Sequence, residues 1–245
     1  MNKEWFDKWF SSKDYLNVYQ HRNDEDAEKL IDLILSEINI NNDSYVLDAA
    51  CGAGRHSILF AKKGFQVTGF DLSETLLNFA KDDANKFGLE ITFYKSDIRN
   101  FFIDTKFDLI VNLFTSFGYF SSDEENFAFV KNAFKMLNKG GFFVLDFFNK
   151  EFLIQNLVSD SQKKINGRTI IEHRKISGNR VIKKIQIKKE SVINEYIESV
   201  RLYAKNEILN KFSDIGFSVN KIFGNYDGEK FDTKNSQRLI IIFTK

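Results

Sequence analysis

The feature that most constrains the fold is a regular alternation of short apolar runs with segments of helical spacing in the first 150 residues. The runs have lengths typical of strands and occupy residues 44–48, 65–71, 91–94, 107–114 and 142–148. Several are apolar at consecutive positions, as strands buried on both faces are. The alternation predicts a parallel sheet with helices on both faces, which is the α/β class.

The segments between these runs have recognisable helix ends. Helices are expected at residues 24–40, 55–63, 73–87 and 124–137. Asp24 and Ser73 suit N-caps, and Gly88 suits the stop that follows the third of these helices.

The pattern changes after Lys150. Antiparallel strands are expected at residues 168–174, 180–188 and 194–203, then a helix at 206–212 and two strands at 217–223 and 238–244. We therefore expect one domain over residues 1–245. Its parts are an aromatic cap (1–23), a cofactor-binding core (24–150), a substrate lid (151–205) and a C-terminal helix with strands that complete the core (206–245).

Composition excludes several classes of protein. The 245 residues carry a net charge of +1 and contain no Pro, and Cys51 is the single cysteine, so neither a disulfide framework nor a multi-cysteine metal site is expected. His21, His56 and His173 lack ligand-like spacing, so no metal is expected. No run of 18 apolar residues and no signal-peptide pattern is present, which favours a cytoplasmic protein without a membrane span.

A glycine-bearing turn follows the first strand, and it reads Asp48-Ala49-Ala50-Cys51-Gly52-Ala53-Gly54. Glycines let a ligand approach the backbone, and the next helix presents its N-terminus there. The second strand ends in Asp71, whose two carboxylate oxygens can accept both hydroxyls of a ribose. Cys51 is expected to be a small loop residue, because no base is poised to activate its thiol.

A dinucleotide-binding fold is the main alternative for this turn. Its fingerprint is G-x-G-x-x-G, but Ser57 occupies the third position here. Arg55 and His56 also fill the space that a closely bound pyrophosphate needs. The pattern of strand, Asp, G-x-G, strand and Asp therefore favours a different nucleoside ligand. An α/β domain without a cofactor remains as the plain alternative.

These motifs resemble those of class I S-adenosylmethionine-dependent methyltransferases. The family pattern [DE]-x-G-x-G-x-G matches from Asp48 to Gly54, with Ala50 in place of the first glycine. The resemblance continues at residues 96–98, 107–111 and 137–141. It implies a Rossmann-like seven-stranded sheet with helices on both faces and an inserted antiparallel β lid. It also implies S-adenosylmethionine as cofactor and S-adenosylhomocysteine as product.

The resemblance assigns cofactor roles to matching positions. Asp48 would orient the turn and the cofactor's amino group, Gly52 and Gly54 would admit its methionine part, and Asp71 would hold the ribose. The further cofactor contacts that it implies are Ala50, Cys51, Leu72, Asp97, Ile98, Asn112 and Leu113. Asp97 would bind the adenine amine, with Leu72 and Ile98 against the ring.

The N-terminal segment is rich in aromatic residues. Trp5, Phe6, Trp9 and Phe10 are expected to form an amphipathic cap that packs on the sheet. Tyr15, Tyr19 and Arg22 fall at helical spacing, so they share one face. Several small-molecule methyltransferases look similar here, and the resemblance makes Tyr19 and Arg22 candidate contacts of the cofactor carboxylate.

The segment after the fourth strand bears on the methyl acceptor. DNA amino-methyltransferases place a Pro-Pro motif there and cytosine C5 enzymes need a Pro-Cys nucleophile, and this chain has neither. The segment resembles the S-F-G-Y stretch of small bacterial methyltransferases of loosely assigned substrate. Phe114, Phe117 and Tyr119 would then wall an apolar pocket, and ordinary core packing is the alternative for each.

The lid is basic. Residues 161–205 contain twelve Lys or Arg and four Glu, which favours an anionic substrate or RNA, although lysines on a half-exposed strand also serve solubility and edge protection. No aromatic residue lies among the basic residues of 161–189, which weakens the case for RNA. His173 is the one weak catalytic candidate, and as an alternative it is a surface residue. Tyr226 lies in a loop that relatives bring near the cleft.

Three functional hypotheses follow. The first is methyl transfer to N or O of a small-molecule metabolite. The second is an RNA methyltransferase that uses the basic lid, and the third is a protein that binds S-adenosylmethionine without turnover. A methyl acceptor that is already nucleophilic needs no base, so the lack of an obvious catalytic base does not count against an enzyme. The chain is expected to be a monomer or a homodimer, and no catalytic residue is assigned.

Overall fold

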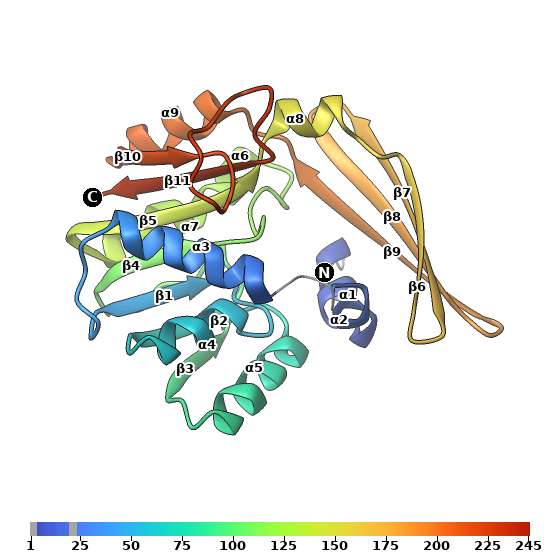
Figure 1. The fold of residues 1–245 in the computed structure, drawn as a ribbon, viewed down its shortest axis with the longest axis horizontal. Helices are drawn as coiled ribbons and strands as arrows, with labels where there is room; N and C mark the ends of the chain where they lie inside the picture. Colours follow the sequence, from blue (N-terminus) through green and yellow to red (C-terminus); the bar gives the residue numbers. More distant parts are fainter. Residues whose placement is uncertain (1–3, 20–23) are drawn as a thin grey trace.

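The computed structural model describes residues 4–19 and 24–245, which form an α/β core and a separate β-sheet lid (Figure 1). The core sheet has the strand order β10-β11-β5-β4-β1-β2-β3. Its strands are β1 (Tyr45–Ala49), β2 (Gln66–Asp71), β3 (Ile91–Lys95), β4 (Phe107–Asn112), β5 (Leu137–Phe148), β10 (Ser218–Phe223) and β11 (Arg238–Thr244).

Strands β1 to β5 pair in parallel, and β11 is antiparallel to both β5 and β10. The carboxyl ends of the parallel strands therefore meet at one edge, where ligands bind in open α/β sheets. The predicted α/β class and the seven-stranded sheet are confirmed.

Helices cover both faces of this sheet. They are α3 (Asp24–Glu37), α4 (Arg55–Lys62), α5 (Glu74–Lys86), α6 (Asp123–Asn126), α7 (Ala128–Met136) and α9 (Lys205–Ile215). On one face Leu30, Ile31 and Ile34 of α3 are fully buried against strands of the sheet. On the other, α7 and α9 bury Val130 and Phe212, so each helix places one apolar stripe on the sheet.

The predicted helix over 124–137 is wrong in detail, because it is two helices with a break at Phe127. The side chain of Asn126 is buried. Its amide nitrogen donates to the carbonyls of Phe120 and Ser122, and its oxygen accepts from the amide of Phe120. The chain turns there to satisfy these buried polar groups.

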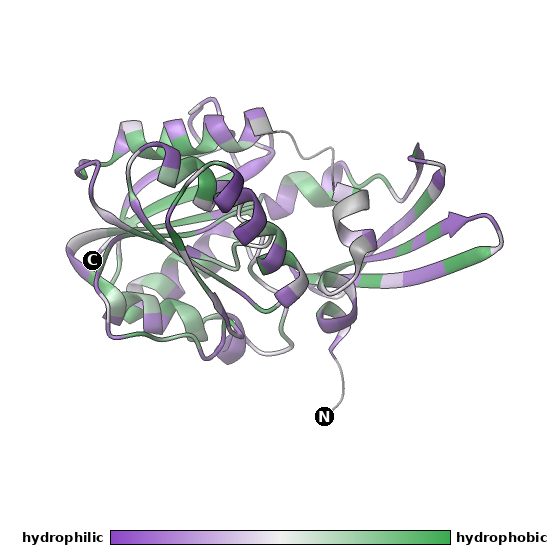
Figure 2. Cartoon of the chain, turned by 90° about the horizontal axis from the view of Figure 1, so that it is seen from below, coloured by the Kyte–Doolittle hydropathy of each residue, from purple (hydrophilic) through white to green (hydrophobic). Residues whose placement is uncertain are grey.

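The lid is a four-stranded antiparallel sheet in the order β6-β7-β8-β9, reached from β5 through α8 (Lys150–Gln155). Its strands are β6 (Asp160–Ile165), β7 (Arg168–Ser177), β8 (Arg180–Lys189) and β9 (Val192–Arg201). Sequence analysis missed α8 and β6. The lid strands alternate polar and apolar residues, whereas the core strands are apolar almost throughout (Figure 2).

The cap consists of α1 (Trp5–Phe10) and α2 (Lys13–Tyr19), which lie between the core and the lid (Figure 1). Trp9 and Val18 are fully buried, and they pack with Ile170 and Ile185 of the lid. The expectation that Trp9 packs on the core sheet is therefore wrong, because the lid sheet is its partner. In the described part of the chain, no helix combines the length and apolarity that a membrane crossing requires.

Candidate cofactor and acceptor sites

The turn after β1 has left-handed backbone at three positions. The φ angles of Ala50, Gly52 and Gly54 are 55°, 56° and 77°. Glycine takes this conformation without penalty, whereas alanine at the first position costs about 1 kcal/mol. The amide of Cys51 donates to the carbonyl of Phe70 over 3.0 Å, which ties the turn to β2.

Gly54 serves helix packing. A Cβ atom at this position would lie 2.7 Å from Cβ of Ala80, so only glycine lets α4 and α5 approach. Gly54 is not among the lining residues of the three cavities described below. Its role in admitting the methionine part of the cofactor stays a prediction.

The two strand-end acids have different surroundings. Asp48 is 1% exposed and accepts a hydrogen bond from Oγ of Ser57 over 2.6 Å, so it braces the turn from beneath. Asp71 accepts from the amides of Gly52 (2.9 Å) and Ser73 (2.8 Å). These bonds fix the Asp71 carboxylate while leaving lone pairs for a ligand.

Burial shifts both carboxyl groups toward the protonated form. It raises the pKa of Asp48 to about 7, against the hydrogen bond from Ser57. Burial also raises the pKa of Asp71, and the backbone amides partly offset this effect. Burial likewise raises the pKa of the Cys51 thiol, so this residue is not an activated nucleophile.

A narrow cavity of about 50 Å³ lies beside the tip of β2. It brings together five of the predicted cofactor residues, which are Ala50, Asp71, Leu72, Asp97 and Ile98. Phe6 and Phe10 of α1 line the same cavity. The cap therefore covers the place where a nucleoside would bind.

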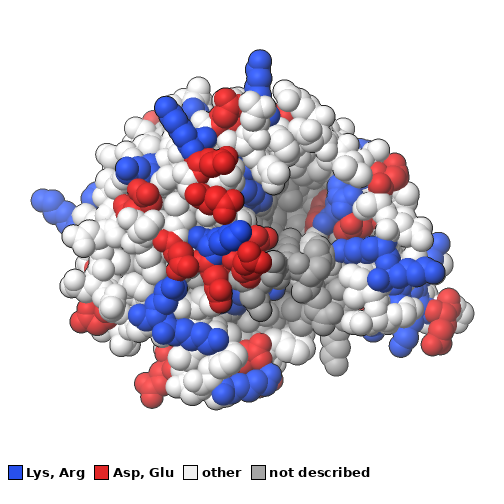
Figure 3. Space-filling view, in the orientation of Figure 1, with Lys and Arg blue, Asp and Glu red and all other residues white. Residues whose placement is uncertain are grey.

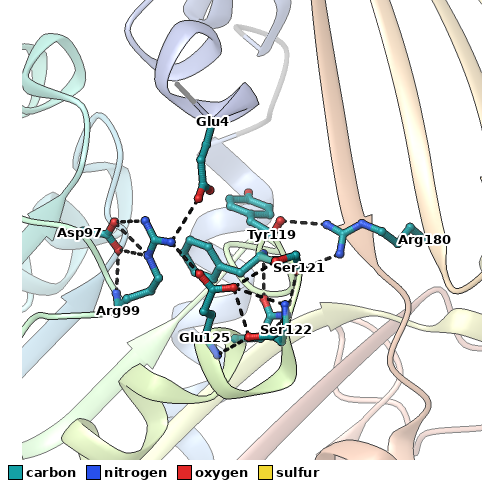
Figure 4. A network of polar contacts seen from close by, with 10 residues as sticks. Glu4, Asp97, Arg99, Tyr119, Ser121, Ser122, Glu125 and Arg180 are labelled. Atoms are coloured by element: carbon teal, nitrogen blue, oxygen red, sulfur yellow. Dashed lines mark hydrogen bonds and ion pairs between the residues drawn. The ribbon is translucent and has the colours of Figure 1, made fainter. Parts of the chain in front are cut away.

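Arg99 links this cavity to the cap (Figure 4). Its guanidinium donates to both oxygens of Asp97, with the shortest distance 2.6 Å, and to the carboxylates of Glu125 (2.9 Å) and Glu4 (3.3 Å). Arg99 therefore fixes the position of the two Asp97 oxygens, which can accept a hydrogen bond from the amine of an adenine. Sequence analysis did not single out Arg99.

A second cavity, of about 440 Å³, lies over the glycine turn. The predicted cofactor residues on its wall are Tyr19, Ala50, Cys51, Gly52 and Leu113. Asn112 lies behind this wall, 1% exposed, and donates to the carbonyl of Ala49 over 3.0 Å. Its Oδ1 has no hydrogen-bond partner among the described residues, so this buried oxygen can accept a hydrogen bond from a ligand beside the turn.

A third cavity, of about 570 Å³, lies between the core, the cap and the lid. We call it the acceptor cavity. Phe114, Tyr119 and Tyr226 line it, as expected. The rings of Phe114 and Tyr226 stack with centroids 5.8 Å apart. Figure 3 shows the surface hollowed between core and lid.

Two predicted acceptor residues are not in this cavity. Phe117 is 5% exposed and packs in the core against Phe127 and Phe147. His173 is exposed on the lid, where it pairs with Asp160. It lies on the strand face opposite to Glu172, whose side chain is buried. Both assignments are corrected.

Asp146 of β5 organises the floor of the acceptor cavity. It is fully buried and accepts from the amide of Phe114 (3.0 Å), the phenol of Tyr226 (3.1 Å) and the guanidinium of Arg238 (2.7 Å). Phe114 and Thr115 are both left-handed, with φ of 52° and 64°. Sequence analysis missed Asp146, although a single acid inside an apolar strand was a usable signal.

Tyr19 lines both the cavity over the glycine turn and the acceptor cavity. Its phenol donates to Glu198 and accepts from Lys183, and the Lys183–Glu198 distance is 2.5 Å. Burial alone would raise the pKa of Glu198, but the Lys183 charge and the hydrogen bonds outweigh burial and hold this pKa below its ordinary value. Arg22 lies outside the described residues.

Comparison with known proteins decides the family of the core. A family model described as a methyltransferase domain matches residues 46–141. These residues are a methyltransferase domain. The match covers the glycine turn, both strand-end acids and Asp97.

Curated relatives of this domain are also methyltransferases by their names. YqeM of Bacillus subtilis (strain 168), a candidate methyltransferase by its name, is 33% identical over 126 residues, 51% of this chain and 50% of that protein. The dTDP-3-amino-3,4,6-trideoxy-alpha-D-glucopyranose N,N-dimethyltransferase of Streptomyces venezuelae is 31% identical over 157 residues, 63% of this chain and 64% of that enzyme. The chain thus spans half to less than two thirds of these relatives.

The fold likeness extends beyond the domain. An S-adenosylmethionine-dependent methyltransferase from Clostridium acetobutylicum ATCC 824 superimposes with a TM-score of 0.84 at 22% identity, over 94% of this chain and 97% of that one. The likeness in fold therefore includes the lid and the cap as well as the core.

S-adenosylmethionine is the cofactor of this family, and the residues of the methyltransferase domain fit it. Asp71 can hold the ribose, Asp97 can accept from the adenine amine, and Oδ1 of Asn112 is a hydrogen-bond acceptor without a described partner beside the glycine turn. No group of three metal ligands occurs among residues 4–19 and 24–245.

Proposed function

We propose that the protein transfers a methyl group from S-adenosylmethionine to N or O of a small molecule bound in the acceptor cavity. The supporting observation is that the acceptor cavity and the cavity over the glycine turn share part of their walls. Tyr15, Tyr19, Phe114 and Tyr119 line both. A cofactor on one side and an acceptor on the other would meet along this boundary, which favours the reaction by proximity.

The size of the acceptor cavity supports a small molecule. Its volume of about 570 Å³ lies within the range of ordinary small-molecule sites, about 300–1,000 Å³. Residues of the lid and the cap form part of its wall, so an acceptor bound there would lie between them and the core. The Streptomyces venezuelae relative is, by its name, an amino-sugar N,N-dimethyltransferase.

When bound, S-adenosylmethionine supplies an electrophilic methyl group on a sulfonium. The residues of this chain would then bind and orient. Asp71 and Asp97 hold the nucleoside, while Asp146 fixes the backbone under the acceptor through Phe114. No residue is required to form a covalent bond.

The basic lid does not need RNA to explain it. Arg180 donates to the carbonyls of Tyr119 and Phe120, and Arg201 pairs with Asp123 and Glu207. These two side chains attach the lid to the core, so part of the charge that suggested RNA has a structural role. We therefore propose a small-molecule acceptor.

Titration with S-adenosylhomocysteine in a calorimeter tests the cofactor site. Asp71→Asn should weaken binding about tenfold or more, because a hydrogen bond to a charged group contributes about 1.5–3 kcal/mol. Asp82→Asn removes the same charge from an exposed position of α5 and should leave affinity unchanged. Thermal unfolding checks that both variants fold.

Incubation with labelled S-adenosylmethionine and separate small-molecule and RNA fractions then tests turnover. Label in the small-molecule fraction supports the proposal. Label in RNA would overturn the choice of acceptor, and binding without any product would favour a binding protein. If wild-type protein binds neither form of the cofactor, the proposed function is wrong.

A further inference from the structure

Aromatic rings form much of the acceptor-cavity wall. Six of them are Trp5, Phe10, Tyr19, Phe114, Tyr119 and Tyr226. They come from the cap, the loop after β4 and the loop before β11, and neighbouring rings touch. Trp5 and Tyr119, for example, meet edge to face with centroids 5.2 Å apart. Ring faces carry negative potential, so such a wall suits an organic cation.

The described cations on this wall are already paired with carboxylates. The pairs are Arg238–Asp146 at 2.7 Å, Lys183–Glu198 at 2.5 Å, Arg174–Glu172 at 2.5 Å and Lys29–Asp227 at 3.6 Å. Each pair is neutral overall. Among the described residues of the wall, no Lys or Arg is therefore left over to bind an anionic acceptor.

One carboxylate on the wall has no such partner. Asp26 is half-buried in the first turn of α3 and makes no ion pair with a described residue. Asp26 and Tyr226 line the same cavity. Burial is the main cause that raises the pKa of the Tyr226 phenol, and the charges of Asp146 and, to a smaller extent, Asp26 add to it. In Figure 3 acidic side chains gather on the core side of the hollow and basic ones on the lid side.

The charge of the wall distinguishes two kinds of acceptor. When an amine is methylated, its lone pair forms the N–C bond, the C–S bond breaks with its electron pair left on sulfur, and the positive charge moves from sulfur to nitrogen. The product ammonium can lose a proton to water afterwards. When an alcohol or phenol is methylated, it must first lose its proton and become an anion. A wall with one unpaired carboxylate and no unpaired described cation stabilises the ammonium product of amine methylation. The same wall disfavours the alkoxide or phenolate anion that methylation of an alcohol or phenol requires.

We infer that the methyl acceptor is an amine, which reacts as the neutral base after giving any proton to water, and that Asp26 and the surrounding aromatic rings stabilise the alkylammonium ion that methyl transfer forms. This inference rests on the proposed function and narrows the reacting atom to nitrogen.

A matched pair of probes tests the binding step. The probes are choline, a quaternary ammonium ion, and 3,3-dimethyl-1-butanol, which has the same shape without the charge. With wild-type protein saturated by S-adenosylhomocysteine, choline should bind about tenfold more tightly than the alcohol in a calorimetric titration, since ring and carboxylate contacts add about 1–2 kcal/mol for a cation.

Variants assign that preference to its residues. Asp26→Asn should reduce choline affinity about fivefold and leave the affinity of the alcohol unchanged. Glu28→Gln makes the same charge change on the exposed side of α3 and should alter neither affinity. Unchanged S-adenosylhomocysteine affinity shows that each variant is folded. Equal affinity of wild-type protein for the two probes, or no binding of choline, overturns the inference.

A competition assay tests the reacting atom. Labelled S-adenosylmethionine is offered to amines and to alcohols and phenols of matching carbon skeleton. Label on nitrogen supports the inference, and label on oxygen overturns it while leaving the methyltransferase proposal intact. If neither the amines nor the alcohols and phenols are labelled, the titration with choline and 3,3-dimethyl-1-butanol decides whether the inference holds. A lack of S-adenosylhomocysteine binding would instead contradict the proposed function itself.

Discussion

Thr115 carries backbone strain at the floor of the acceptor cavity. It follows Phe114 in a left-handed conformation, which is costly for a β-branched residue. Its amide donates to the carbonyl of Asp146 over 3.1 Å, and its hydroxyl accepts from Arg238 over 3.0 Å. The surrounding hydrogen bonds therefore hold a conformation that the residue itself disfavours.

Thr115→Gly and Thr115→Ala both remove the hydroxyl, but only glycine adopts this backbone freely. We expect the glycine variant to be more stable than the alanine variant by about 1 kcal/mol, measured as the free energy of unfolding in urea. Equal stabilities would show that position 115 is not left-handed in solution.

Asp48 should make stability depend on pH. Its pKa is about 7 in the folded protein and near the ordinary 3.8 when unfolded, so the folded state binds more protons between these values. Stability from this group is present at low pH and falls as pH rises from about 4 to about 7.

Asp48→Asn keeps an oxygen for Ser57 and removes the titration. The variant should gain about 2.7 kcal/mol more over wild type at pH 8 than at pH 5, since two pH units separate pH 5 from the folded pKa and each corresponds to about 1.36 kcal/mol. Denaturant unfolding at both pH values measures this difference. A gain that does not change with pH would show that Asp48 is not the buried titrating group.

At the scale of elements, helix α1 covers the nucleoside cavity. Phe6 and Phe10 line that cavity, and Oγ of Ser73 donates to the carbonyl of Phe10 over 2.7 Å. The cavity of about 50 Å³ is smaller than an adenosine, so α1 or its rings must shift when the cofactor enters.

We expect S-adenosylhomocysteine to slow hydrogen exchange in α1, because a bound nucleoside adds apolar contacts to Phe6 and Phe10. The amides of α9, on a face of the core away from this cavity, provide the internal control. The two tryptophans of the chain, Trp5 and Trp9, both lie in α1, so intrinsic fluorescence should change in the same titration. Unaltered exchange in α1 would contradict the covering role.

Elements with strong periodicity were predictable, and those without it were not. The apolar runs located β1, β2, β3, β4 and β11, and Ser73 does cap α5. Strand β6 was missed because it reads Asp-Ser-Gln-Lys-Lys-Ile, which lacks apolar alternation and forms only as an edge strand beside β7. Partnership with a neighbour, rather than its own composition, makes it a strand.

At the scale of the whole molecule, features formed by one continuous stretch of chain were predictable from the sequence. The turn from Asp48 to Gly54 and the acid at Asp71 predicted the cofactor side of the sheet, and the matched family confirms their class. Contacts between distant segments were not predictable. Whether His173 reaches the acceptor cavity depends on strand register, and whether Phe117 does depends on the path of a loop, and a single sequence specifies neither.

The lid sheet has no hydrogen-bonded neighbour in the core sheet, and β5 and α9 flank it in the chain. A module inserted in this way can be exchanged between relatives at its two junctions while the nucleoside-binding half stays as it is. Lid grafting at these two junctions would therefore change one wall of the acceptor cavity and leave the glycine turn as it is.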